Sequence, residues 1–201
     1  MGKPVVIVGD AMLDVDIEGS ANRLSPEAPV PVVDAERIWH RPGGAGLAAV
    51  LAARADRDVV LVTALGDDAD GRALTELLTS AGVDVVALPM AGTTVCKTRI
   101  RAGGQSMLRI DHGDGTAAND VLSQRVATVL KAARAVCVAD YGHGVTGHLG
   151  IRALLTRVAA AQVPIVWVPH PCGAEPTPGC WLVTPNQAEA DHFSDLADSN
   201  A

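Results

Sequence analysis

Aromatic residues are the scarcest class in this sequence, with three Trp, one Tyr and one Phe among 201 residues. The hydrophobic core must therefore be built from Val, Leu, Ile and Ala. Hydrophobic residues make up 48% of the chain and charged residues 19%. This balance favours a globular fold, argues against disorder, and at this length allows one domain with a sizeable core.

An excess of basic residues is also lacking, because the formal net charge is −7. Nucleic acids and anionic membrane surfaces bind clustered Lys and Arg, so neither is an expected partner, although a local basic pocket for a phosphate remains possible. No apolar run reaches membrane-spanning length, and the first ten residues do not resemble a signal peptide. We therefore expect a cytoplasmic protein.

The four cysteines show no Cys-x-x-Cys spacing. Cys96 and Cys137 lie in apolar runs, which favours buried, reduced thiols. Cys172 and Cys180 lie in a Pro/Gly-rich loop with His170. A metal site there would need closely paired ligands, so we do not expect one.

Short apolar runs alternate with segments of helical period along most of the chain. Strands are predicted near 5–8, 59–62, 135–138 and 164–168, and helices after Gly44 and around 74–81, 122–133 and 151–158. Strands that are apolar on both faces predict a doubly wound α/β fold, with a mostly parallel sheet between helices. Ligands of such sheets bind at the carboxyl ends of the strands.

Two segments, 28–40 and 94–111, are predicted as extended strands without an intervening helix. Gly103-Gly104 in the second segment indicates a hairpin turn. Together the two segments predict a small β-lid that stands off the main sheet. We find no internal repeat or linker, so residues 1–201 are expected to form one domain.

Candidate ligand-binding residues follow the predicted strands. Gly43 and Gly44 open a helix, where a ligand can approach the backbone and exposed amides suit an anion or a hydroxyl. Asp10 and Asp14 follow the first strand, where they could hold sugar hydroxyls or simply cap a turn. The acidic segment 66–71 leads into a helix, and at least one of its carboxylates is expected to be an N-cap.

The order of motifs resembles the PfkB family of carbohydrate kinases, which have a ribokinase-like fold. The motifs are GDAMLD, SPEAPVPVV, RPGGAG, LGDDADG, TVCKTRIRAGGQSMLRID, ADYGHG and VTPNQAEAD. The run Ser25–Val32 and the hairpin that ends Arg109-Ile110-Asp111 look specifically like D-glycero-β-D-manno-heptose-7-phosphate kinases, the kinase half of the bifunctional ADP-heptose synthesis protein. The resemblance extends from about Val5 to Glu189.

The resemblance implies transfer of the γ-phosphoryl group of ATP, with Mg²⁺, to a sugar phosphate. For heptose 7-phosphate the acceptor would be the anomeric hydroxyl. By position, Asp14, Gly43 and Gly44 would hold the sugar. Lys97 and Arg109 on the lid hairpin are candidates for its phosphate, or else they belong to a solvated strand face.

Three further residues match family positions nearer the end of the chain. Asp140 ends a core strand at the carboxyl edge of the sheet and is a candidate for substrate binding. Asn186 and Glu189 match the family's Asn-x-x-Glu, which positions Mg²⁺ and the nucleotide phosphates. The alternative for this pair is an ordinary helix start after Pro185.

The sequence also departs from the family. No Gly-Ala-Gly-Asp turn, whose Asp serves as the catalytic base, occurs in residues 1–201, so we expect an incomplete domain without a catalytic residue of its own. Leu47 stands where the family carries a sugar-binding Asn. His143 replaces a Lys that is frequent in heptose kinases, and Val168-Pro169-His170 replaces a strand end that usually reads Asp-Pro.

Three hypotheses follow. The protein is a sugar-phosphate kinase whose chain is incomplete here, or a truncated, inactive sugar-phosphate-binding relative, or a damaged gene product without a stable role. The DNA beyond codon 201 would distinguish them.

An incomplete sheet exposes edges and faces, so we also expect a homo-oligomer formed through the lid or an exposed sheet edge.

Overall fold

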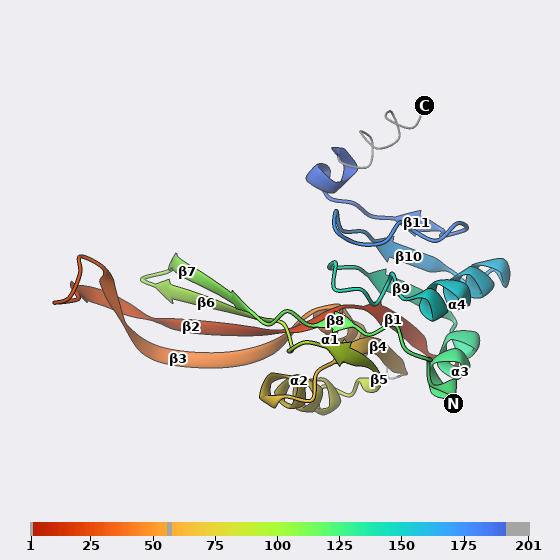
Figure 1. Cartoon of the computed structure of the whole chain (residues 1–201), viewed down its shortest axis with the longest axis horizontal. Coiled ribbons are helices and arrows are strands. Elements are labelled where there is room, and N and C mark those ends of the chain that lie inside the picture. The colour runs from red at the N-terminus through yellow and green to blue at the C-terminus, as the bar shows by residue number, and fades with distance from the viewer. Residues whose placement is uncertain (1, 56–57, 192–201) are drawn as a thin grey trace.

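The computed structural model describes residues 2–55 and 58–191 and is built around a seven-stranded sheet (Figure 1). Across the sheet the strands are β11 (Leu182–Val183), β10 (Ile165–Val168), β9 (Ala135–Ala139), β1 (Val5–Gly9), β4 (Val59–Leu65), β5 (Asp84–Ala91) and β8 (Thr116–Ala117). Neighbouring strands are parallel except β5 and β8, which are antiparallel. The carboxyl ends of the central strands therefore meet at one edge.

Helices cover both faces of this sheet: α1 (Ala45–Ala55), α2 (Ala69–Ser80), α3 (Gln124–Ala132) and α4 (Leu149–Ala160). Successive residues of β1 point to opposite faces. Ile7 therefore packs in a cluster with Leu74 of α2, whereas Val8 packs in a second cluster with Leu130 of α3 and Leu155 of α4. The predicted α/β class, with a mostly parallel sheet between helical layers and a small β-lid, is confirmed.

The lid is a separate four-stranded sheet in the order β3-β2-β6-β7. Its strands are β2 (Ala11–Leu24), β3 (Pro31–Gly44), β6 (Cys96–Ala102) and β7 (Gln105–His112). Figure 1 shows them extending together away from the main sheet. The segments 28–40 and 94–111 of the sequence analysis overlap β3 and the β6–β7 hairpin. The long strand β2, which the sequence analysis does not place, lies between them.

The two faces of the lid differ in chemistry because successive residues of a strand alternate between them. Register pairs Asp14 of β2 with Lys97 of β6 and with Arg41 of β3, so these side chains share one face. This charged face carries Asp14, Asp16, Glu18, Arg37, Arg41, Lys97, Arg99, Arg101, Arg109 and Asp111. The opposite, apolar face carries Ile17, Ile38, Ile100, Leu108 and Ile110.

Candidate functional site

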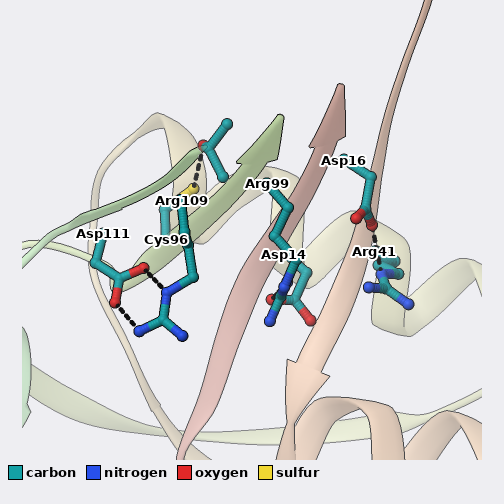
Figure 2. A network of polar contacts seen from close by, with 8 residues as sticks. Asp14, Asp16, Arg41, Cys96, Arg99, Arg109 and Asp111 are labelled. Atoms are coloured by element: carbon teal, nitrogen blue, oxygen red, sulfur yellow. Dashed lines mark hydrogen bonds and ion pairs between the residues drawn. The ribbon is translucent and has the colours of Figure 1, made fainter. Parts of the chain in front are cut away.

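Asp14 lies at the root of the lid, where β2 leaves the main sheet. Its Oδ1 accepts a hydrogen bond of 2.7 Å from Nη1 of Arg99 on β6, as Figure 2 shows. The Asp14 side chain is 11% exposed and that of Arg99 34%, so water screens this pair only partly. A charge-assisted bond in such a setting fixes the direction of the carboxylate.

Gly43 lies against this carboxylate, and Gly44 follows it directly before α1. A Cβ on Gly43 would stand 2.7 Å from Oδ2 of Asp14, so no larger residue fits there without displacing Asp14. Gly44 has a φ of +57°, which favours glycine, and a Cβ on it would clash with the carbonyl oxygen of Asp10. That oxygen accepts a 3.0 Å hydrogen bond from the amide of Ala45. The structure thus brings together Asp14, Gly43 and Gly44, as the sequence analysis expects of a sugar site.

Lys97 and Arg109 both lie on the charged face, but in different states. Arg109 donates two hydrogen bonds to Asp111, of 2.9 Å and 2.6 Å (Figure 2). The hydrogen bonds and charge of Asp111 raise the pKa of Arg109, and the hydrogen bonds of Arg109 lower the pKa of Asp111 against a small opposing effect of burial. Lys97 is paired in register with Asp14 and Asp111. Within the described part of the chain its ammonium has neither a hydrogen bond nor an ion pair.

Asp10 anchors the loop that follows β9. Its carboxylate accepts hydrogen bonds from the amides of Tyr141 (2.9 Å), His143 (3.1 Å) and Val145 (3.1 Å). Burial raises the pKa of Asp10, the three amide bonds lower it, and the neighbouring Asp140 carboxylate raises it further, with a net upward shift. Of the two roles that the sequence leaves open for Asp10, the carboxylate therefore performs a structural one.

Asp140 is buried behind the same loop. Its oxygens accept hydrogen bonds from the amide of Gly142 (2.9 Å), the hydroxyl of Thr146 (2.5 Å) and the amide of Ala174 (2.9 Å). These bonds tie the loop after β9 to the loop after β10. A substrate that reached Asp140 would have to compete with these protein donors, so its substrate role stays a prediction.

Asn186 and Glu189 face each other across the first turn of a helix at 187–191. The Asn186 amide and side-chain nitrogen each donate a 2.7 Å hydrogen bond to Glu189, and the Glu189 amide donates one of 3.0 Å to the Asn186 side chain. This reciprocal arrangement is a capping box. The helix start that the sequence analysis weighed is present, and a nucleotide or Mg²⁺ role for the pair remains a prediction.

Arg99, Asp16 and Arg41 are the site residues that the sequence analysis misses. Arg41 forms an ion pair with Asp16, with Nε 2.8 Å from Oδ2, directly beside the Asp14–Arg99 pair (Figure 2). Their signal is the strict alternation of Asp14, Val15 and Asp16 along β2, which puts both carboxylates on one face. Two acid–base pairs therefore line the charged face at the lid root.

Comparison with known proteins gives first the class of fold and then the family. A ribokinase of Arabidopsis thaliana, solved with ribose and ATP, superimposes with a TM-score of 0.67 at 20% identity, covering 97% of this chain and 64% of that one. A ribokinase of Thermotoga maritima gives 0.62 at 17% identity, with 98% and 63% covered. These similarities show that the fold is ribokinase-like.

Sequence comparison defines the family. The pfkB family carbohydrate kinase profile matches residues 3–201. A protein named Bifunctional protein HldE from Streptomyces coelicolor is 48% identical over 95% of this chain, and its counterpart from Vibrio vulnificus is 40% identical over 92%. This chain spans 39% of the length of each of these relatives. The chain belongs to the pfkB family of carbohydrate kinases, which confirms the resemblance drawn from its motifs.

None of the helices in residues 2–55 and 58–191 is both long enough and apolar enough to cross a bilayer.

Proposed function

We propose that this chain binds the sugar phosphate in an ATP-dependent kinase whose substrate is heptose 7-phosphate and whose acceptor is the anomeric hydroxyl. One observation carries the proposal: the Asp14 carboxylate is fixed by Arg99 directly over the backbone of Gly43. A fixed acceptor beside bare backbone suits a sugar hydroxyl, because hydroxyls need both an acceptor and close approach. The heptose assignment rests on the sequence resemblance of the hairpin and the 25–32 segment.

The charged face supplies what the phosphate of the substrate needs. Lys97 is the candidate of first choice, since its register partners are Asp14 and Asp111 and its ammonium makes no hydrogen bond among the described residues. Arg109 can serve once a dianion displaces Asp111, which holds it now. A charge-assisted contact from either cation would orient the sugar for attack.

Residues toward the end of the chain fit the nucleotide side. Mg²⁺ prefers carboxylate oxygens and commonly binds through one or two of them together with phosphate oxygens and water. Glu189 offers such a carboxylate and is held in place by Asn186. When bound, ATP supplies the phosphoryl group that is transferred. Because such a kinase draws on the ATP of the cell interior, we also propose a cytoplasmic location.

The test is phosphoryl transfer by the protein made from its complete reading frame. With ATP, Mg²⁺ and heptose 7-phosphate, we expect a heptose bisphosphate, and Asp14→Asn should reduce the rate by about 10²-fold or more through loss of positioning. Asp34→Asn is the matched control, because Asp34 is an exposed lid carboxylate that pairs with the exposed Arg23. Equal rates in both variants would remove Asp14 from the site.

Two other outcomes would revise the proposal. Faster transfer to an unphosphorylated sugar would overturn the heptose 7-phosphate assignment while leaving a kinase. Binding of heptose 7-phosphate without transfer would instead support a sugar-phosphate-binding protein.

For the phosphate contact, Lys97→Ala should raise KM by about tenfold or more, since hydrogen bonds to charged groups contribute about 1.5–3 kcal/mol. Arg101→Ala, which removes an exposed cation farther along the same strand, should change KM little.

We further propose that two copies of the chain associate through the apolar face of the lid. Ile38, Leu108 and Ile110 are 57%, 54% and 45% exposed, although they lie together on one sheet face. A contiguous apolar patch of this kind is commonly a protein interface. A second copy supplies the same apolar surface and would leave the charged face free for substrate.

A further inference from the structure

Three side chains with different donor atoms converge at the root of the lid. Asp70 comes from the first turn of α2, Cys96 is the first residue of β6, and His112 is the last residue of β7. Their carboxylate oxygen, thiol sulfur and imidazole nitrogen all lie within 4.8 Å of one another. Cys96 and His112 are directly opposite in the antiparallel pair, and Nε2 of His112 is 3.1 Å from Oδ2 of Asp70.

We propose that Asp70, Cys96 and His112 form a binding site for Zn²⁺. Sulfur, imidazole nitrogen and carboxylate oxygen are the ligands that zinc uses in proteins, and three of them with water complete a tetrahedron. Zinc bonds of about 2.0–2.3 Å place such ligands roughly 3.3–3.6 Å apart. The Asp70 and His112 donors are already this close, at 3.1 Å, and the Cys96 sulfur, within 4.8 Å of both, needs to approach by about 1 Å at most, which side-chain rotation can supply.

The environment of the three side chains favours a bound metal, because the sulfur is weakly hydrogen-bonded and solvent can reach the other two donors. The Cys96 sulfur is buried, and its one hydrogen-bonding contact within residues 2–55 and 58–191 is a weak one, at 4.0 Å, with the hydroxyl of Thr98. Burial keeps this thiol protonated by raising its pKa. A bound cation takes the place of that proton and makes the thiolate a ligand. Asp70 and His112 have side chains 38% and 54% exposed, which leaves a path from solvent.

This site is separate from the proposed sugar site. Cys96 and Lys97 are adjacent on β6 and therefore point to opposite faces of the lid. The charged face with Asp14 and Arg99 is thus on one side, and the three donor atoms are on the other. A cation held by Asp70 on α2 and by both strands of the hairpin would clamp the lid root to the α/β layer. The metal would restrict lid movement without touching the substrate.

The direct test is zinc titration of the reduced, chelator-treated protein by calorimetry. We expect one Zn²⁺ per chain, with His112→Gln weakening binding by more than about tenfold. His112 is exposed, so this variant should keep the fold. His40→Gln is the matched control, because it changes another exposed lid histidine outside the cluster. No stoichiometric binding, or equal affinity of the wild type and His112→Gln, would overturn the site.

Cobalt identifies the sulfur ligand. Co²⁺ in the wild type should give tetrahedral d–d bands and a thiolate-to-metal charge-transfer band. Cys96→Ser should lose the charge-transfer band, whereas Cys172→Ser, at an exposed cysteine, should keep it. A band that survives in Cys96→Ser and disappears in Cys172→Ser would move the metal elsewhere and overturn the assignment.

Hydrogen exchange tests the clamp itself. Zinc should slow amide exchange in residues 96–112 of the wild type and leave exchange in His112→Gln unchanged. Unchanged exchange in a wild-type protein that binds zinc would refute the clamping role. Calorimetry, cobalt spectroscopy and hydrogen exchange do not depend on kinase activity, so the zinc site and the proposed function can fail independently.

Discussion

At the scale of single residues, the Asp14–Arg99 pair makes the clearest prediction. Arg99→Met keeps the aliphatic part of the side chain but leaves the nearly buried Asp14 carboxylate without its cation. An unpaired charge in that position costs free energy, so we expect the free energy of unfolding to fall by about 1–3 kcal/mol. Denaturant titration measures this change.

The control is Arg23→Met, because Arg23 pairs with Asp34 at 3.1 Å while both side chains are more than half exposed. Exposed ion pairs contribute about 0–1 kcal/mol, so this variant should be nearly neutral. A similar loss in both variants would mean that the burial of the Asp14–Arg99 pair does not matter.

Residue-scale prediction from sequence succeeded where the signal is local and failed where it is not. Asp14, Gly43 and Gly44 are adjacent to recognisable motifs, and the structure does bring them together. The partner of Asp14 is 85 residues away in the sequence. Three cations of β6, Lys97, Arg99 and Arg101, point to the same face of the lid. The register of β2 and β6 places Lys97 opposite Asp14, and Arg99, two residues farther along β6, is the cation that reaches the carboxylate. Asp10 holds amides more than 130 residues away, which no local pattern predicts.

At the scale of elements, the N-cap of α2 connects a helix to the lid. Asp68 accepts hydrogen bonds from the amides of Gly71 (2.7 Å) and Thr94 (2.8 Å). Asp68→Ala removes both acceptors, and we expect it to lower the free energy of unfolding by about 0.5–2 kcal/mol at neutral pH. Asp67→Ala is the control, since the Asp67 side chain is fully exposed and pairs with the exposed Arg72.

The pH dependence of this effect has a definite sign. Burial would raise the pKa of Asp68, but the amide bonds from Thr94 and Gly71 outweigh it and hold that pKa below the ordinary 3.8. The stabilisation is therefore complete above pH 3.8 and declines as the pH falls through the lower, folded-state pKa. The difference between wild type and Asp68→Ala should shrink in acid. A difference that is constant down to strongly acidic pH would contradict this account.

Helices and strands were predictable from the sequence wherever one spacing of apolar residues continued without interruption. The i, i+3, i+4, i+7 pattern of 74–81 falls within α2 and just past its end, with Leu74 and Leu78 fully buried. The strand β2 was missed although Leu13–Glu18 alternates strictly, because β1 ends at Gly9 and a second strand begins at Ala11. Asp10 between them looks like the end of a strand. In the fold it is the point at which the chain passes from one sheet to another.

At the scale of the whole molecule, the lid is a thin sheet with one charged and one apolar face. The central strands of the main sheet are covered by helices on both sides, but among the described residues the lid has no helical layer of its own. Its apolar residues are therefore buried only if another molecule covers them. Figure 1 shows how far the four strands extend from the α/β layer, which leaves room for a second lid to pack against the first.

The last prediction tests this association with a matched pair of variants on β7. Leu108 pairs with Ile100 on the apolar face and is 54% exposed, whereas Ser106 pairs with Arg101 on the charged face and is also exposed. Leu108→Glu would bury a carboxylate in an apolar interface, which is costly without a partner. We expect sedimentation to show a dimer for the wild type and for Ser106→Glu, and a monomer for Leu108→Glu. A wild type that stays monomeric at all concentrations, or dissociation in both variants alike, would contradict pairing through the apolar face, because only that face distinguishes the two substitutions.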